Sequence, residues 1–240
     1  MLFSVPKEPF PYIPPVIEPE FPAAGIKDMS KATIALVTTT GIVPKGNPDR
    51  IPSSNASIYG YYNISGVDDL IENGWETADG EYDPAYANMD ADRMVPVDVL
   101  RDLEKEGMIG KLYNQFWSTS GNGMAIVNAK RMAAEIAEQI KTTGIDCIIV
   151  TSTGGTGTRA GATIAKEIET LAKIPVAIIC VVVPIAKTVG ASRIIPGIAI
   201  PHVLGNPALT PEEEKALRRG IVEKAVTALS TDVYEPTIFE

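Results

Sequence analysis

The sequence predicts an α/β protein whose mostly parallel sheet has helices on both faces. Three apolar runs, at 32–39, 145–150 and 174–183, are almost continuous, and helical patterns separate them. Strands that are covered on both faces have this composition. The 240 residues suffice for one large α/β domain, or for a domain with an arm. We expect a single domain at 31–240 that follows an extended, proline-rich N-terminal arm at 1–30.

Bulk properties exclude several classes of partner. The net charge of −9 disfavours nucleic acid and anionic membranes. No apolar stretch is long enough to span a bilayer, and the first residues lack the pattern of a signal peptide. Cys147 and Cys180 lie inside apolar strand patterns, which predicts buried, reduced thiols in a cytoplasmic protein.

The arm is rich in proline, which favours extended backbone and prevents a helix. Aromatic residues are interleaved with these prolines, which is unusual for a purely solvated linker. We expect the arm to lie on its own domain or on a neighbouring subunit. The aromatic residues are Phe3, Phe10, Tyr12 and Phe21.

The first strand, at 32–39, leads into a long irregular insertion at about 42–95. Its polar and aromatic composition indicates an ordered lid or a subunit contact, because long loops inside a compact domain are usually functional. Apolar spacing then predicts helices and strands in alternation. The expected helices are at 96–107, 124–141 and 161–172, and a further strand is expected at 112–119.

A turn-rich segment at 184–209 follows the strand at 174–183. The last helix opens at Thr210-Pro211-Glu212-Glu213, which combines an N-cap, a proline at the first position and a glutamate at the third. In a parallel sheet the turns after the strands meet at one edge, where ligands bind. Three of these turns are rich in hydroxyls and glycine: 38–41, 119–123 and 151–161.

The most informative of these turns is Thr151–Gly161, which runs from a strand into a helix. Its small residues allow close approach of the backbone, and the helix dipole favours negative charge there. We expect it to hold a small anionic or zwitterionic ligand. It contains no Cys, His, Asp or Glu, so it has no evident nucleophile or base. The candidate ligand-binding residues are Thr39, Thr40, Thr151, Ser152, Thr153, Gly155, Thr156, Thr158 and Arg159.

Two common phosphate-binding patterns do not fit this turn. The spacing of Gly155, Gly157 and Gly161 is one residue too long for a dinucleotide loop, and no Gly-Lys-Ser/Thr sequence is present. Arg159 could pair with a ligand carboxylate, or it could form a salt bridge at the surface or at a subunit interface. Lys187 and Arg193 are further cations expected near the strand ends.

His202 is the only histidine of the chain. It could act as a general acid or base, or it could be a structural hydrogen-bonding residue. One histidine without a cluster of carboxylates does not make a metal site, so no metal is expected.

The pattern Thr151-Ser-Thr-x-Gly-Thr-x-Thr-Arg-x-Gly-Ala-Thr163 resembles the active-site loop of the selenoprotein subunit (component B) of glycine, sarcosine and betaine reductases. The resemblance covers roughly residues 30–240 and continues in the segments 41–50, 82–88, 96–107, 200–207 and 211–219. The usual component B chain is about twice this length, so this chain is similar to its C-terminal half. The selenoprotein subunit of D-proline reductase is similarly short.

In the family this loop carries a selenocysteine and two cysteines, at the positions of Gly154, Gly157 and Ala160. The resemblance implies a reaction in which a partner subunit's pyruvoyl group holds the substrate amine as a Schiff base. The selenolate then cleaves the C–N bond. Glycine cannot do this, and the chain is expected to carry no cofactor of its own. The joint loss of all three residues suggests a paralogue with another role, or an engineered loop.

Three functions follow as hypotheses. The first is a selenium-free component-B-like protein that binds a small amino or carboxylate compound without cleaving C–N bonds on its own. The second is an enzyme of different chemistry, such as a lyase, racemase or hydrolase acting on a small acid, with His202 in a catalytic role. The third is a structural subunit of a reductase-like complex. The arm and the insertion predict a homo-oligomer, or a hetero-complex with a reductase-type partner subunit.

Overall fold

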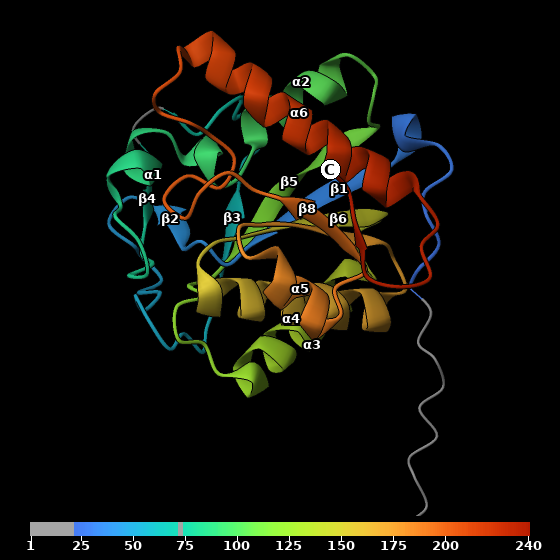
Figure 1. The fold of residues 1–240 in the computed structure, drawn as a ribbon, viewed down its shortest axis with the longest axis horizontal. Helices are drawn as coiled ribbons and strands as arrows, with labels where there is room; N and C mark the ends of the chain where they lie inside the picture. Colours follow the sequence, from blue (N-terminus) through green and yellow to red (C-terminus); the bar gives the residue numbers. More distant parts are fainter. Residues whose placement is uncertain (1–21, 72–73) are drawn as a thin grey trace, which may run out of the picture.

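The computed structural model describes residues 22–71 and 74–240 of the chain, and there a central sheet lies between two layers of helices (Figure 1). The strands of this sheet are β1 (Thr33–Thr38), β3 (Gly60–Asn63), β5 (Lys111–Ser118), β6 (Cys147–Ser152), β7 (Val176–Cys180), β8 (Arg193–Pro196) and β9 (Thr237–Ile238). Within the described residues they pair in the order β3-β5-β1-β6-β7-β8-β9. Every pair is parallel except β3 with β5. The predicted α/β class with a mostly parallel sheet is therefore confirmed.

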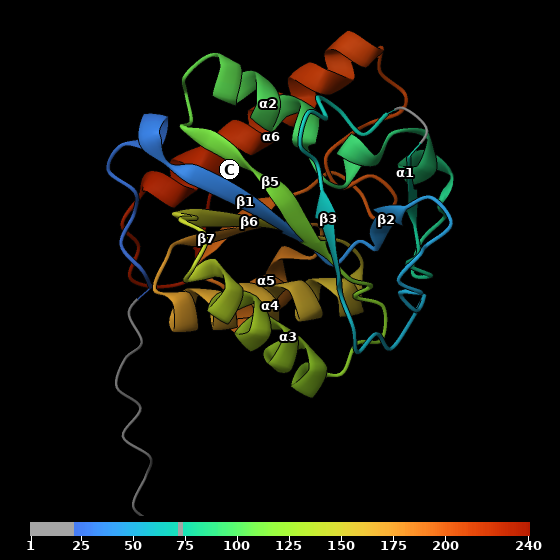
Figure 2. The same cartoon turned by 180° about the vertical axis from the view of Figure 1, so that it is seen from behind.

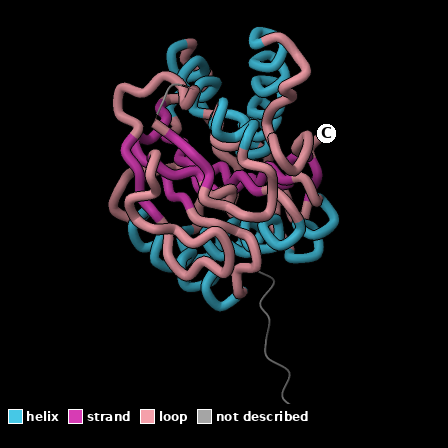
Figure 3. The backbone as a smooth tube through the Cα atoms, turned by 90° about the vertical axis from the view of Figure 1, so that its left-hand side faces the viewer, coloured by secondary structure: helices cyan, strands magenta, loops and turns pink. Residues whose placement is uncertain are grey.

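Helices cover both faces of the sheet, as predicted. Figure 2 shows α3, α4 and α5 on one face and α2 and α6 on the other, and Figure 3 shows the sheet between these layers. The helices are α1 (Ala85–Met89), α2 (Val97–Lys105), α3 (Ile126–Ile140), α4 (Gly155–Ala172), α5 (Val183–Val189) and α6 (Pro211–Ser230).

Alternate residues of β1 belong to the two cores. Ile34 and Leu36 pack with α2 and α6, whereas Ala35 and Val37 pack with α3 and α4. Successive side chains of a strand point to opposite faces, so a strand buried on both faces needs apolar residues throughout. This explains why the apolar runs in the sequence identified the central strands.

The strand order reverses direction at β1. The chain passes from β1 to β5 on one side and continues through β6, β7 and β8 on the other. At such a point the loops that leave two neighbouring strands diverge and open a crevice beyond their carboxyl ends. Here Thr38 of β1 is paired with Thr151 of β6, so the turns after these strands start side by side.

The insertion at 42–95 contains more regular structure than expected. β3 extends the main sheet, and β2 (Ile42–Pro44) pairs with β4 (Trp75–Thr77) in a small antiparallel sheet. Ring stacking of Tyr61 on Trp117, with centroids 4.8 Å apart, helps to hold β3 on β5. Such short strands among turn residues give too weak a periodicity to be recognised in the sequence.

Two other boundaries were predicted wrongly. The helix expected to begin at 161 begins at Gly155, so most of the glycine-rich turn is the first part of α4. The segment at 184–209, expected to be turns, contains most of α5 and all of β8. Arg193 therefore starts a strand at the edge opposite the turns. It is fully buried and bound to Glu169 at 2.7 Å, so the expectation that it lies near the carboxyl ends is wrong.

Most of the predicted arm, residues 1–21, lies outside the described residues. The part at 22–30 packs on its own domain, at the amino end of the sheet. Ala23 donates its N–H to Glu169 at 3.0 Å and accepts a hydrogen bond from Arg193 at 2.6 Å. Gly25 donates to Asp232 at 2.8 Å.

A buried ion network joins the insertion to α2 and α6. Arg218 of α6 pairs with Asp98 of α2 and, at 2.7 Å, with Asp90 of the insertion. Arg93 binds Glu214 at 2.8 Å beside it. Asp92 is fully buried in this region, and its side chain accepts hydrogen bonds from backbone N–H groups rather than from an arginine.

Burial, with a further contribution from the charges of Asp98 and Asp90, raises the pKa of Asp92 well above its usual range, although Arg218 opposes this. The folded state therefore favours protonated Asp92. That stabilisation is complete below the ordinary aspartate pKa of about 3.9 and is lost as the pH rises through the folded pKa. Asparagine has no such dependence. In urea unfolding, we expect Asp92→Asn to lower the free energy of unfolding more at pH 4 than at pH 8. A cost that grows with pH would show that the ionised form is the stabilising one.

Among residues 22–71 and 74–240, no helix combines the length and apolar character that a membrane crossing requires.

Candidate functional site

The hydroxyl groups after β1 and β6 bond to one another. The Oγ1 atoms of Thr38 and Thr40 are 2.7 Å apart, and Thr151 donates to Thr38 at 2.8 Å. Thr39 Oγ1 and Ser152 Oγ are also 2.7 Å apart. These buried contacts tie the two strand ends together at the point where the sheet reverses direction.

The hydroxyls of the following turn bond to the backbone. Ser152 donates to Gly157 O at 2.7 Å, Thr158 donates to Gly154 O at 2.6 Å, and Thr153 donates to Ile200 O at 2.5 Å. Thr156 Oγ1 accepts the N–H of Gly123 at 3.0 Å. The predicted residues are thus brought together, and their hydroxyls have partners inside the protein. Their role in ligand binding stays a prediction.

The N-terminus of α4 holds a carboxylate of the same chain, that of Glu81. Its Oε1 accepts the N–H groups of Gly155 at 2.9 Å and Thr156 at 3.2 Å, and its Oε2 accepts that of Gly157 at 3.2 Å. A helix begins with N–H groups that have no partner in the helix, and its dipole favours an anion there. The anion-binding geometry expected from the sequence is therefore present, but a side chain from the insertion occupies it.

Glu81 is not among the site residues predicted from the sequence. It lies 74 residues from Gly155 along the chain, inside the insertion, and no motif connects the two. A general signal was available, because an acidic residue is a natural partner for a helix N-terminus. That signal does not say which of the chain's 30 acidic residues is the partner.

Two neighbours anchor the segment that carries Glu81. Asp79 accepts hydrogen bonds from Ser120 Oγ at 2.8 Å and Gly121 N at 3.0 Å, and Tyr82 donates to Thr40 O at 2.6 Å. Burial raises the pKa of Asp79, against the opposing effect of hydrogen bonds from the backbone N–H groups of Glu81 and Asn122 and from the Ser120 hydroxyl. Burial also raises the pKa of Tyr82, which keeps the phenol neutral and able to donate. Glu81 therefore belongs to a segment that hydrogen bonds hold in place on both sides, next to the N-terminus of α4.

The family resemblance implies reactive positions at Gly154, Gly157 and Ala160, and the first two of these lie beside the Glu81 carboxylate. Gly154 has φ +63° and ψ −175°, a conformation essentially restricted to glycine. A Cβ atom at Gly154 would overlap the Glu81 carboxylate, and one at Gly157 would lie 3.2 Å from Glu81 Oε2. Ala160 is fully buried in the core beneath α4. With Glu81 in place, the turn has no room for a side chain at 154.

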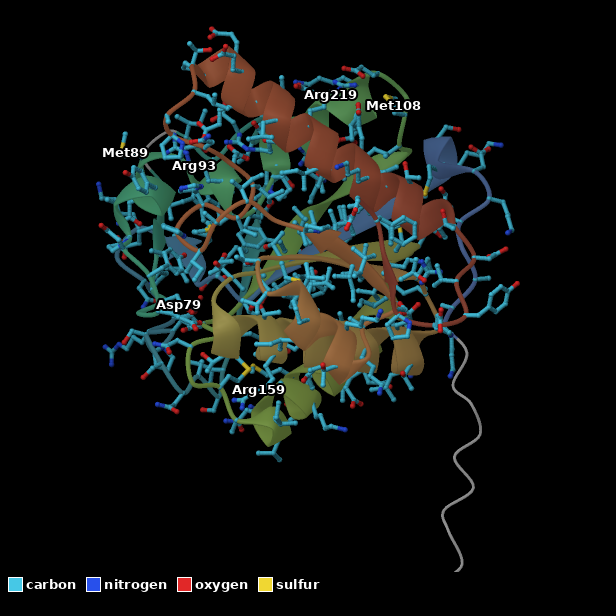
Figure 4. All side chains as sticks on the ribbon, viewed as in Figure 1. Asp79, Met89, Arg93, Met108, Arg159 and Arg219 are labelled. Atoms are coloured by element: carbon cyan, nitrogen blue, oxygen red, sulfur yellow. The ribbon has the colours of Figure 1, made fainter. Side chains whose placement is uncertain are left out.

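A cavity of about 570 Å³ opens beside Glu81. Arg159 reaches it from α4, and Figure 4 labels Arg159 and also Asp79, which anchors the segment of Glu81. Arg159 donates from Nη2 to Met124 O at 3.1 Å, whereas its buried Nε has no hydrogen-bond partner within the part of the chain that the structure describes. The cavity is lined by Glu81, Gly155, Thr156, Arg159, Pro184, Ile185, Thr188 and Val189.

His202 is not among the lining residues of this cavity. Its Nδ1 lies 2.7 Å from Gly205 O, and its ring packs edge-on against Tyr86 with centroids 5.6 Å apart. These contacts orient the ring, and its proposed catalytic role stays a prediction. Within the described part of the chain, no group of three or more His, Cys, Asp or Glu side chains is placed to hold a metal ion.

Comparisons with known proteins add evidence of descent. The family model described as glycine/sarcosine/betaine reductase selenoprotein B matches residues 11–153. Glycine reductase complex component B subunit gamma of Peptoclostridium litorale is 60% identical over 229 residues, which cover 95% of this chain and 52% of that protein. Sarcosine reductase complex component B subunit beta of Peptoclostridium acidaminophilum is 48% identical over 229 residues, with the same coverage.

D-proline reductase subunit gamma of Acetoanaerobium sticklandii is a more distant relative, 28% identical over 228 residues, which cover 94% of this chain and 91% of that protein. The chain spans about half the length of the glycine and sarcosine reductase relatives. No solved structure matches it.

Proposed function

Because the chain belongs to the glycine/sarcosine/betaine reductase selenoprotein B family, we propose that it is a component-B-type subunit that binds a small amino or carboxylate compound in the cavity beside α4. The observation that carries this proposal is Arg159, which lines the cavity and whose Nε has no hydrogen-bond partner among the described residues. A buried N–H donor without an acceptor is costly, and a ligand carboxylate would supply one.

The cavity is lined by a negatively charged side chain as well as by the positively charged Arg159. Glu81 and Arg159 both line it, so a ligand with separated positive and negative ends can meet a complementary group at each end. The wall formed by Pro184, Ile185 and Val189 suits a small aliphatic body. These features support an amino acid or a related zwitterion.

We propose that this chain does not carry out the reductive C–N cleavage of its family on its own. Gly154, Gly157 and Ala160 have no nucleophilic side chain, and the chain has 2 cysteines. Both cysteines are buried in strands. Burial raises the pKa of Cys180 to about 12 and also raises the pKa of Cys147, so neither supplies a thiolate at ordinary pH.

The relatives in Peptoclostridium litorale and Peptoclostridium acidaminophilum are named as components of reductase complexes. We therefore propose that this chain works in a hetero-complex, in the cytoplasm, with a partner subunit that supplies the pyruvoyl group implied by the family resemblance. The alternative of a purely structural subunit has one observation in its favour: the hydroxyls of the strand-end turns bond within the protein. Ligand binding separates the two functions.

The test is a thermal-shift titration of the purified chain with glycine, sarcosine, betaine and acetate. We expect at least one of the zwitterions to raise the Tm of the parent protein. A ligand at 100 times its Kd stabilises by about 2.7 kcal/mol. Arg159→Ala is expected to remove this shift, because it removes the partner of the ligand carboxylate.

Arg131→Ala is the matched control. Arg131 is exposed on the neighbouring helix α3 and pairs with Glu135 at 2.6 Å, away from the cavity, so the shift should persist in this variant. An unchanged Tm with every compound would reject ligand binding and favour the structural subunit. An equal loss of the shift in both arginine variants would reject the role of Arg159.

A further inference from the structure

The first N–H groups of α4 all have hydrogen-bond acceptors within the chain. Glu81 takes those of Gly155, Thr156 and Gly157, and the N–H of Thr158 bonds to Gly154 O at 3.3 Å. An incoming anion therefore finds no unpaired donor there, and it also meets the negative charge of Glu81. The Glu81 carboxylate, which belongs to the same chain, offsets the partial positive charge at the N-terminus of α4.

Hydrogen bonds on both sides hold the segment that carries Glu81. Asp79 is bonded to Ser120 and Gly121 on one side, and Tyr82 to Thr40 on the other. Only the side chain of Glu81 is free to rotate away, and this would leave three N–H groups of α4 without an acceptor. The three N–H groups of α4 therefore hold the carboxylate in the cavity wall.

We propose that Glu81 determines the charge selectivity of the cavity. Its carboxylate excludes simple anions from the N-terminus of α4 and accepts the cationic end of a ligand, which directs the ligand's carboxylate to Arg159. This inference rests on the proposed function, and it adds which groups the cavity rejects and in which orientation a zwitterion binds.

Inorganic sulfate is a probe of this role that needs no amino ligand. We expect Glu81→Ala to bind sulfate at least about ten-fold more tightly than the parent protein, because three N–H groups at a helix N-terminus become free. In ¹⁵N-resolved NMR spectra, the amide signals of Gly155, Thr156 and Gly157 should move on titration. Glu81→Gln loses the charge but keeps an acceptor oxygen, so an intermediate affinity is expected.

The matched control is Glu76→Ala. Glu76 belongs to the same insertion, and its carboxylate also accepts a backbone N–H, that of Gly46 at 3.1 Å, but it does not line the cavity. This variant should bind sulfate as the parent does. The proposal is overturned if the parent binds sulfate at the α4 amides as tightly as Glu81→Ala, or if neither Glu81 variant binds sulfate more tightly. Because Glu81→Gln preserves the shape of the side chain, it gives this answer even if Glu81→Ala does not fold.

Glycine and acetate differ by one ammonium group. Comparing their affinities therefore tests whether the ammonium group of a bound zwitterion lies at Glu81. We expect Glu81→Gln to lower the preference for glycine over acetate by about ten-fold, because a charge-assisted hydrogen bond is lost. An unchanged preference would overturn the assignment of the ammonium group to Glu81. Failure of the parent to bind glycine, with the sulfate result as expected, would instead reject the proposed function and leave the exclusion of anions by Glu81 standing.

Discussion

Arg218→Leu is expected to lower the free energy of unfolding by about 3–5 kcal/mol, because it leaves buried carboxylates without their counter-ion. Arg218 pairs with Asp90 and Asp98, and Asp92 lies beside them. The side chain of Arg218 is only 2% exposed, so its contacts with these carboxylates are made inside the protein. Urea unfolding at neutral pH measures the loss.

The neighbouring Arg219 provides the control. Its side chain is 33% exposed, pairs with Glu106 and Glu223 on the surface, and contacts Met108 (Figure 4). Exposed pairs contribute about 0–1 kcal/mol, so Arg219→Leu should be mild. Equal losses in the two variants would show that the buried network does not stabilise the junction of the insertion with α2 and α6.

The second large effect is expected at Gly154. Gly154→Ala should cost about 1–3 kcal/mol, because its backbone conformation is essentially restricted to glycine and a Cβ atom would overlap the Glu81 carboxylate. In a Glu81→Ala background, the overlap between the new Cβ atom and the carboxylate is removed, but the cost of the backbone conformation at position 154 remains. We therefore expect a coupling of about 0.5–1 kcal/mol or more between the two positions, measured by a double-mutant cycle in urea.

Gly155→Ala is the matched control for this prediction. A Cβ atom at Gly155 would meet only Ile185 Cδ1, at 4.0 Å, and this position is helical. The substitution should be tolerated or slightly stabilising. If Gly154→Ala is as mild as Gly155→Ala, the turn adopts another backbone, and position 154 can accept a side chain without displacing Glu81.

The fold could be predicted from the sequence where burial imposes a simple pattern. β1, β6 and β7 lie on or near the predicted apolar runs, because a strand covered on both faces has apolar residues throughout. β3 and β8 could not be found in this way, since each spans only four residues and lies among turn residues. The placement of Arg193 failed for the same reason, because an unrecognised strand carries it to the opposite edge of the sheet.

The candidate site shows a different limit. The family resemblance was correctly recognised, because each of its motifs consists of residues close together in the sequence. Local reasoning also indicated that the start of α4 attracts an anion. It could not identify Glu81 as that anion, since the pairing depends on how a long insertion folds back over the sheet.

The most direct test of the ligand site is an NMR titration that follows the side-chain Nε–H signal of Arg159. This group is buried and has no acceptor among the described residues, so a bound carboxylate should change its environment strongly. With glycine, sarcosine or betaine at saturation, we expect this signal to shift together with the amides of Gly155 and Thr156. Saturable binding that leaves the Arg159 signal unchanged, or that moves only signals remote from α4, would contradict the proposed site.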